Sequence, residues 1–269
     1  MTFLHRRSLL RAAAGGALAG AAAAGCGRAE EEGAGAGVAG PATPSVRASK
    51  KPSPKPSAPR AALPPLPPGL PAQIEHGPRG GHAVALTFHG QGDPRTAGEL
   101  LTEAERAGAR VTVLAVGSWL EEQPQMARRV LDGGHELGNH TMSHLDICSM
   151  RADAAYAEIA RCAEVLRRLT GGVGRWFRPS RAQRATERVV RMARKAGYPH
   201  VLSYDVDSLD FTDPGAEAVR HSVLGAVRPG SVVSLHFGHD GTVAALPAIL
   251  DGLHRRGLRA VTTTELLTR

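Results

Sequence analysis

Two histidines four residues apart give the strongest chemical signal in this sequence. Residues 134–144 read GHELGNHTMSH, so His140 and His144 follow a short apolar segment. On a helical turn this spacing places both imidazoles on one side, where they can bind one tetrahedral metal ion. A pair at this spacing also occurs on ordinary helix surfaces, but its position directly after a strand favours a metal. His140 and His144 are therefore candidate metal ligands, with a surface or helix-capping pair as the alternative.

Polar residues follow several other predicted strands. These residues are His89, Asp93, Arg178, Asp207, Asp210 and His236. In folds built from parallel strands, binding and catalytic groups gather beyond the carboxyl ends of the strands. We therefore expect these side chains to surround the histidine pair.

The elements that must position these residues alternate along the chain from about residue 76. Apolar runs predict strands, and amphipathic stretches between them predict helices. Strands are expected at 83–88, 110–116, 136–138, 176–177, 200–204, 231–236 and 259–261. Strands separated by single helices pair in parallel through right-handed crossovers. The alternation of strands and helices therefore predicts an α/β fold. Six or seven such units favour a barrel over an open sheet.

Several motifs in order along residues 80–269 resemble the polysaccharide deacetylases, which form carbohydrate esterase family 4 and are also called the NodB homology domain. The matching segments are Leu86-Thr87-Phe88, His140 to His144, Phe177-Arg178-Pro179, Asp207 to Phe211 and Ser234-Leu235-His236. The resemblance implies a distorted (β/α) barrel of about seven units. It also implies a hydrolase that removes N-acetyl groups from an amino-sugar polymer such as peptidoglycan.

The resemblance implies a metal cofactor and specific roles for three histidines and their neighbours. In the family a divalent metal, usually zinc, is held by one Asp and two His, and it lowers the pKa of a bound water. His140 and His144 correspond to the two histidine ligands. His236 corresponds to the general acid that protonates the leaving amine.

The third and fourth motifs supply orienting groups, and each differs from the family's motif at one position. The resemblance makes Arg178 an orienting cation, with Asp207 and Asp210 as its partners. The chain has Ser180-Arg181 where the family has an aromatic residue, which implies an altered substrate groove. The fourth motif has Phe where the family has Trp.

The first motif departs most strongly from the family. The family reads Thr-Phe-Asp-Asp-Gly, whereas residues 87–93 read TFHGQGD, so His89 stands at the position of the base and Gly90 at that of the metal ligand. In one interpretation Asp93 is the third ligand and His89, with an imidazole pKa near 6.5, is the base. In a second, His89 is itself the third ligand; in a third, the metal is lost. A Gly-Asp-Pro helix start also explains Asp93 without any chemistry.

These alternatives leave two functional hypotheses. The first is a metal-dependent deacetylase with His89, Arg178, Asp207, Asp210 and His236 as catalytic groups. The second is a catalytically inactive glycan-binding lipoprotein with the same fold, which the missing first-motif carboxylates favour. The two hypotheses differ in whether Asp93 or His89 completes a three-ligand metal site: the deacetylase requires such a site, and the glycan-binding protein does not. We expect the deacetylase, acting as a monomer.

The distribution of charge argues against a nucleic-acid partner. The net charge is +8, of which +3 falls in residues 1–25 and +2 in residues 26–75, leaving +3 for the remaining chain. No cluster of Lys and Arg interleaved with aromatic residues occurs in that remainder, so nucleic-acid binding is not expected. A basic segment next to a membrane anchor fits anionic lipid or wall polymer better.

The first 75 residues have the composition of an export signal followed by a disordered linker. Residues 1–26 read as an export signal, and Arg6-Arg7 before Ser-Leu-Leu resembles a twin-arginine signal. The residues before Cys26 resemble a lipobox, which predicts a lipid on Cys26 and a location on the outer face of the cytoplasmic membrane. Cleavage after an Ala-x-Ala site and free secretion is the alternative. Residues 27–75, rich in Pro, Ala and Gly, predict a disordered tether, with the folded domain at 76–269.

Two cysteines and two tryptophans allow alternative interpretations. After export, Cys148 and Cys162 could form a disulfide, although Cys162 also fits as a small buried residue. Trp119 and Trp176 could stack on sugar rings, although a buried Trp is the commoner case.

Overall fold

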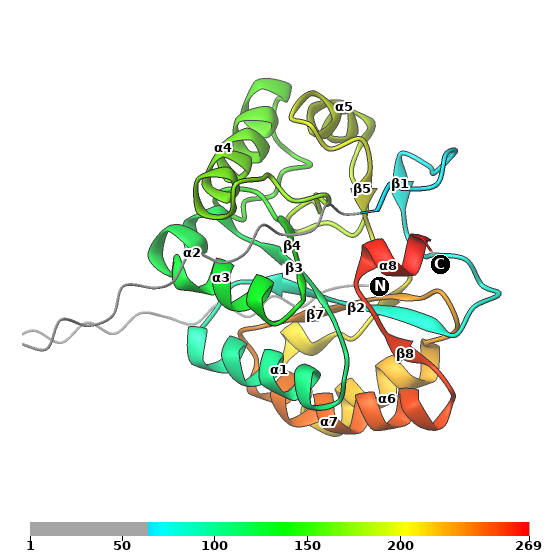
Figure 1. Cartoon of the computed structure of the whole chain (residues 1–269). Coiled ribbons are helices and arrows are strands. Elements are labelled where there is room, and N and C mark those ends of the chain that lie inside the picture. Colours follow the sequence, from blue (N-terminus) through cyan, green and yellow to red (C-terminus); the bar gives the residue numbers. More distant parts are fainter. Residues whose placement is uncertain (1–63, 269) are drawn as a thin grey trace, which may run out of the picture. The chain divides into compact units, whose positions relative to one another are not determined.

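The computed structural model of this protein describes residues 64–268 (Figure 1). The predicted export signal, the predicted lipidation site at Cys26 and the predicted tether as far as residue 63 lie outside the described residues.

A parallel sheet forms the centre of the domain, with β2 (Ala83–Gly90) in its middle. β2 pairs with β3 (Thr112–Ala115) on one side and β7 (Val232–His236) on the other. β4 (Glu136–Asn139) extends the sheet beyond β3, β6 (Val206–Asp207) extends it beyond β7, and β8 (Arg259–Ala260) pairs with the start of β2. The continuous apolar run of β2 is explained by burial on both faces, as is typical of parallel sheets.

Phe177 continues the curve of the sheet from β4 to a second, two-stranded part. It forms single parallel bridges with Asn139 at the end of β4 and with Val201 in β5 (Val201–Leu202). Among the described strands no ladder joins β5 to β6, so the curved sheet is open at that point. The order β6-β7-β2-β3-β4, extended through Phe177 to β5, confirms the expected α/β fold with parallel strands.

The structure extends the folded domain to residues before the predicted boundary at residue 76. β1 (Gln73–Ile74) pairs in parallel with β5, and Ile74 is buried in the core. The side chain of Gln73 also exchanges two hydrogen bonds with the backbone of Ala185, at 2.8 and 3.0 Å. Composition predicted a tether here because proline dominates the segment, but one strand pairing and one buried isoleucine fix its end to the domain.

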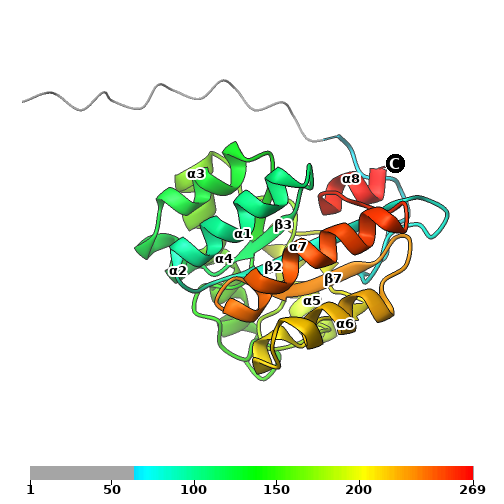
Figure 2. The same ribbon diagram turned by 90° about the horizontal axis from the view of Figure 1, so that it is seen from below.

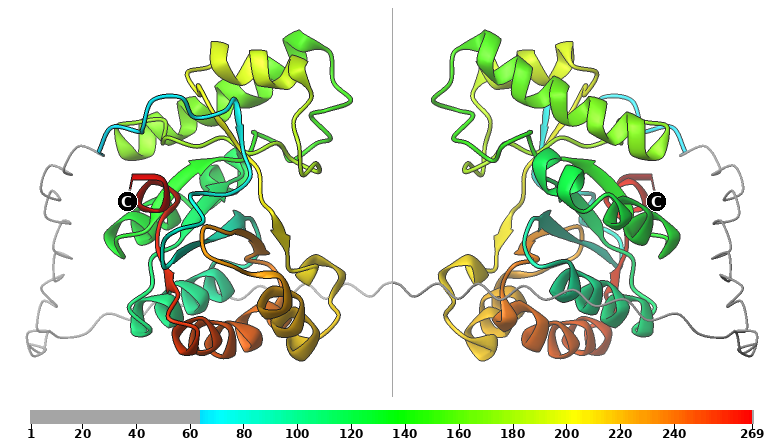
Figure 3. Two further views of the ribbon diagram at one scale, coloured as in Figure 1. Left: turned by 90° about the vertical axis from the view of Figure 1, so that its right-hand side faces the viewer. Right: turned by 90° about the vertical axis from the view of Figure 1, so that its left-hand side faces the viewer.

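Helices cover the sheet on both sides. Their bounds are α1 (Pro94–Arg106), α2 (Gly117–Glu122), α3 (Gln125–Asp132), α4 (Ala152–Thr170), α5 (Glu187–Lys195), α6 (Ala216–Ala226), α7 (Asp240–Arg255) and α8 (Thr263–Thr268), with a 3-10 turn at Asp210–Thr212. Figure 2 shows α1, α7 and α6 lying side by side across β2 and β7. On another side α4 packs against α2 and α5, and Figure 3 shows α4 in green beside α5 in yellow.

The apolar spacing of α4 shows why it forms and where it ends. Ala155, Ile159, Cys162 and Leu166 recur at helical spacing and are buried, while the opposite face is polar. The helix ends at Gly171, whose φ of 81° is a left-handed conformation that glycine adopts without steric cost.

Trp119 and Trp176 are buried in the core and do not present faces to a sugar. Cys148 and Cys162 are both free, so the disulfide considered above is not formed. None of the helices between residues 64 and 268 combines the length and apolar character needed to cross a membrane.

Candidate metal centre

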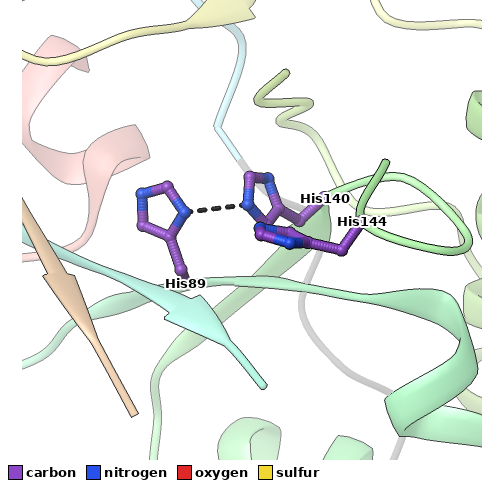
Figure 4. A group of neighbouring side chains, drawn as sticks. All are labelled: His89, His140 and His144. Atoms are coloured by element: carbon purple, nitrogen blue, oxygen red, sulfur yellow. Dashed lines mark hydrogen bonds between the residues drawn. The ribbon is translucent and has the colours of Figure 1, made fainter. Parts of the chain in front are cut away.

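Three imidazoles converge at the carboxyl ends of the central strands (Figure 4). His89 stands near the end of β2, His140 follows β4 directly, and His144 lies on the next loop. One ring nitrogen from each residue lies within 4.8 Å of the other two. His89 Nδ1 and His140 Nε2 are 2.8 Å apart, and the ring centroids of His140 and His144 are 4.9 Å apart. The arrangement is that of a candidate metal centre with three nitrogen donors.

The parallel register of the strands explains why these residues meet. Gly90 pairs with Ala115, and Ala115 pairs with Asn139, so β2, β3 and β4 end at the same level. The residues at these strand ends, although far apart in sequence, therefore share one edge of the sheet. Asn139 anchors that edge, because its side-chain nitrogen donates to the carbonyl of Ile159 at 2.9 Å and its side-chain oxygen accepts from the backbone N–H of Thr141 at 2.9 Å.

A loop, and not the helical turn considered above, brings His144 beside His140. Thr141 and His144 both have positive φ, at 68° and 53°, which non-glycine residues rarely adopt. The Thr141 hydroxyl oxygen accepts a hydrogen bond from the backbone N–H of His144 at 3.2 Å and holds the tight turn. Such conformations cost on the order of 1–3 kcal/mol each and cluster at functional sites.

The surroundings favour the neutral form of all three imidazoles. Burial lowers the pKa of His89, His140 and His144, and neighbouring positive charges, including Arg181 beside His144, lower it further. His140 Nδ1 lies 3.0 Å from the carbonyl oxygen of Arg178, which can only accept, so Nδ1 carries the proton. Nε2 of His140 therefore directs its lone pair toward the other two rings, which is the form that binds a metal.

Asp93, expected as the third ligand, lies outside this group. Its side chain is the N-cap of α1 and accepts a hydrogen bond from the backbone N–H of Arg95 at 2.7 Å. The residue is exposed, and Pro94 at the first helical position fixes the chain there. The structure therefore places His89, and not Asp93, beside the two histidines of the His-x-x-x-His motif.

Arg178 is buried beneath the site, but its partners differ from those expected. Its guanidinium donates to the carbonyl oxygens of residues 202 and 203 at 3.2 and 3.0 Å. Neither Asp207 nor Asp210 forms an ion pair with it in the described part of the chain. Burial lowers the pKa of Arg178 to about 10, although the negative charge of Asp207 opposes the shift. Backbone carbonyls thus replace the expected carboxylates as partners of the guanidinium, and Asp210 is engaged by His236 and Thr242 instead.

Asp210 instead holds His236. One carboxylate oxygen of Asp210 lies 2.6 Å from His236 Nδ1, and the other accepts from the backbone N–H of His236 at 2.8 Å and from the Thr242 hydroxyl at 2.6 Å. Burial alone would raise the pKa of Asp210, but these hydrogen bonds and the charge of His236 outweigh it and lower the pKa. The His236 ring stacks on His89 with centroids 4.3 Å apart. His236 and Asp210 therefore form a preorganised pair next to the three imidazoles.

A cavity of about 530 Å³ opens beside these groups. Asp207 lines it, with one carboxylate oxygen accepting from the backbone N–H of Leu209 at 3.0 Å. Phe211, which stands at the Trp position of the fourth motif, is 49% exposed and meets the His236 ring edge-on at 5.6 Å. The cavity is lined by His89, Gln91, Gly92, His144, Arg181, Ala182, Gln183, Tyr204, Asp207, Phe211, His236, Gly238 and His239.

Two residues that support the site were missed from the sequence. Ser234 places its hydroxyl 3.0 Å from His89 Nε2, and Thr242 holds Asp210 from α7. The position of Ser234 carried a usable signal, because it lies two residues before His236 in the same strand and so faces the same side. Thr242 carried no such signal, since only the packing of α7 brings it close.

Comparisons with known proteins identify the family to which the chain belongs. The family profile described as polysaccharide deacetylase matches residues 76–201. A peptidoglycan-N-acetylglucosamine deacetylase of Bacillus cereus is 31% identical over 194 residues, which cover 68% of this chain and 87% of the relative. A chitooligosaccharide deacetylase of Sinorhizobium fredii is 31% identical over 200 residues, which cover 66% of this chain and 88% of the relative.

Solved structures show the same fold. A peptidoglycan N-acetylglucosamine deacetylase structure superposes with a TM-score of 0.69 at 28% identity, covering 73% of this chain and 92% of that one. A pseudoenzyme of carbohydrate esterase family 4 from Bacillus anthracis also has a TM-score of 0.69, at 23% identity, covering 74% and 69%. The second likeness concerns the fold alone. The chain therefore belongs to the polysaccharide deacetylase family, also called the NodB homology domain.

Proposed function

We propose that this protein is a metal-dependent hydrolase that removes N-acetyl groups from an amino-sugar polymer such as peptidoglycan. The observation that carries the proposal is the convergence of His89, His140 and His144 beside a cavity of about 530 Å³. Curated relatives that act on peptidoglycan or on chitooligosaccharides support the class of substrate.

The donor set suits a divalent metal, and zinc in particular. Three neutral imidazoles that leave a fourth position open are a known catalytic zinc arrangement. In this proposal His89 supplies the third nitrogen in place of the family's aspartate, since its Nδ1 already lies 2.8 Å from His140 Nε2. A bound divalent ion would polarise the acetamide carbonyl and lower the pKa of a water.

Residues of the chain protonate the leaving amine and contact the substrate. Asp210 holds His236 at Nδ1, which leaves Nε2 of His236 to deliver a proton to the leaving amine. Arg178 fixes His140 through its carbonyl oxygen and donates to the backbone below the site. Phe211 offers an apolar ring surface at the cavity, beside His236.

The proposal is tested by metal content and acetate release in the full chain. After incubation with zinc, cobalt or nickel, we expect about one ion per chain and release of acetate from peptidoglycan or a chitooligosaccharide. His89→Ala distinguishes its two possible roles: loss of the ion identifies a ligand, whereas a retained ion with loss of acetate release identifies a base. Absence of bound metal under all three conditions would overturn the proposal.

One observation favours a second candidate, a glycan-binding protein without catalysis. His89 and Gly90 stand where the family carries its two carboxylates, and no carboxylate is grouped with the three imidazoles in the described chain. Binding of oligosaccharide without acetate release from any metal-loaded form would favour this candidate.

We further propose that the protein is exported, lipid-anchored at Cys26, and acts as a monomer on the outer face of the cytoplasmic membrane. The support is the sequence of residues 1–26, with Arg6-Arg7 before a short apolar stretch that ends at Cys26. Labelling of growing cells with an alkyne fatty acid should mark the wild-type protein and not Cys26→Ala. Equal labelling of both would contradict the anchor.

A further inference from the structure

The cavity carries one arginine that the proposed reaction does not use. Arg181 lines the cavity together with His144, in the third-motif position where the family has an aromatic residue. The substitution exchanges a ring for a fixed positive charge in the wall of the cavity. This exchange changes which substrate groups the wall can recognise.

The backbone on both sides of Arg181 is anchored. Ser180 is fully buried, accepts a hydrogen bond from the Thr141 hydroxyl at 3.1 Å and donates to the carbonyl oxygen of Leu145. Gln183 donates from its side chain to the carbonyl oxygen of Tyr204 at 3.0 Å. The guanidinium of Arg181 therefore extends from a fixed base at the edge of the cavity.

The carboxylates closest to the cavity along the 207–213 segment already have partners. Asp207 accepts from the backbone of Leu209, Asp210 holds His236, and Asp213 lies 2.7 Å from His239 Nδ1. Arg181, by contrast, has no carboxylate partner among residues 64–268. An arginine with no internal partner at a cavity wall presents planar, paired N–H donors suited to a carboxylate.

The geometry points to Arg181 as a specificity-determining residue that binds a carboxylate on a sugar adjacent to the one that is deacetylated. The inference deepens the proposed function and rests on it, because it names the class of polymer that the same site takes. That polymer is an anionic amino-sugar chain, and a neutral chain of the same length should bind more weakly. The carboxylate can belong to a lactyl ether on an amino sugar or to a uronic acid.

The test measures binding of defined tetrasaccharides to the zinc-loaded full chain by calorimetry. The first probe alternates N-acetylglucosamine and N-acetylmuramic acid without peptide, and its matched control carries the lactyl groups as neutral methyl amides. The second probe alternates N-acetylglucosamine and glucuronic acid, and the neutral reference is chitotetraose. Comparing the two anionic probes identifies the source of the carboxylate.

We expect at least one anionic probe to bind about tenfold more tightly than its neutral counterpart, as one charge-assisted pair provides. Arg181→Gln should reduce this ratio to about one, whereas Arg181→Lys should keep part of it. Arg161→Gln is the matched control, because it removes the same charge from the exposed face of α4. Thermal unfolding of each variant verifies that it is folded.

Each outcome separates this inference from the proposed function. Equal binding of charged and neutral probes, or a preference that Arg181→Gln leaves intact, overturns the inference. A preference that depends on Arg181 without any acetate release overturns the hydrolase and leaves the recognition of a carboxylate standing. Absence of binding by all four oligosaccharides overturns both.

Discussion

The two ends of the strands in the curved parallel sheet bury polar side chains in opposite ways. At the amino ends of the strands, the carboxylate of Glu136 accepts from the backbone N–H of Thr264 at 3.1 Å, from the Thr264 hydroxyl, and from the Thr112 hydroxyl at 3.3 Å. At the carboxyl ends, His89 and His140 direct ring nitrogens at each other beside a cavity. One end satisfies its polar group within the chain, and the other gathers donors that a bound ion could use.

This difference assigns different tasks to the two ends. A buried carboxylate with all its partners supplied by the chain joins α8 to β3 and β4 and so stabilises the domain. Converging imidazoles that burial keeps neutral offer lone pairs to an external ligand. In barrel-related folds built from parallel strands, chemistry belongs to the carboxyl ends of the strands and stability to the amino ends. Substitutions at the two ends should therefore change different observables.

The largest effect is expected for His140→Ala, at the carboxyl end. Loss of one of three nitrogen donors should abolish stoichiometric metal binding and lower acetate release by at least about 10³-fold, since a metal supplies several kcal/mol to the transition state. Metal content by mass spectrometry and acetate release measure the two effects. His254→Ala, on the exposed side of α7, is the matched control and should retain both. Full metal content in His140→Ala would contradict the assignment of metal binding to the carboxyl ends of the strands.

His236→Ala should separate proton transfer from metal binding at the same end. His236 is held by Asp210 and lies outside the group of three imidazoles, so the variant should keep its metal. Loss of a general acid costs about 10²–10⁴-fold in rate, and we expect kcat to fall within that range. A steady-state assay alongside metal analysis tests this. Loss of the metal together with the activity would place His236 among the ligands instead.

The same contrast shows how much of the fold could be predicted from the sequence. Apolar runs bounded by glycine located the central strands, and their single-helix spacing predicted the parallel pairing. Pro-rich composition concealed β1, because the pairing of two residues and the burial of Ile74 are tertiary effects without a local pattern. Composition describes a segment on average, whereas one buried side chain can anchor it.

The site could be predicted only in part for a similar reason. The polar residues after strands, His140 and His236 among them, were found because strand ends of a parallel sheet share one edge. The partners of Arg178 are backbone carbonyls, which no sequence pattern marks. The left-handed turn at Thr141 and His144 occurs without glycine, so its geometry left no signal in the residue types.

At the amino end, Glu136→Ala should affect stability alone. The substitution leaves the hydroxyl of Thr264 and its backbone N–H buried without an acceptor, which costs about 2 kcal/mol. For a domain of this size, Tm should fall by about 4–8 °C. Metal content should stay at the wild-type level, and loss of metal without loss of Tm would remove the distinction between the two ends.

Glu136→Gln sharpens the test through pH. Burial raises the pKa of Glu136 above its ordinary value of 4.5, and the hydrogen bonds from Thr264 oppose the shift only in part. The folded state therefore binds the proton more readily than the unfolded state does. The contribution of this carboxyl to stability is complete below pH 4.5 and is lost as the pH rises through the folded pKa. The stability of the wild type relative to Glu136→Gln, from urea midpoints, should thus fall with rising pH, and a constant difference would contradict the shift.

The smallest effect is expected for Asp93→Ala, which tests whether the carboxyl end uses this residue in chemistry at all. Asp93 caps α1 through one hydrogen bond to the N–H of Arg95, and loss of an N-cap costs about 1 kcal/mol. Asp93→Asn keeps a cap acceptor and should restore most of that stability, so the pair separates the cap from any role of the charge. Both variants should retain metal and acetate release if His89 is the third ligand. If Asp93→Ala and Asp93→Asn both lose the metal while Asp93→Asn keeps its Tm, the glycine-rich loop before α1 must bring the carboxylate to the site, and His89 is free to act as the base.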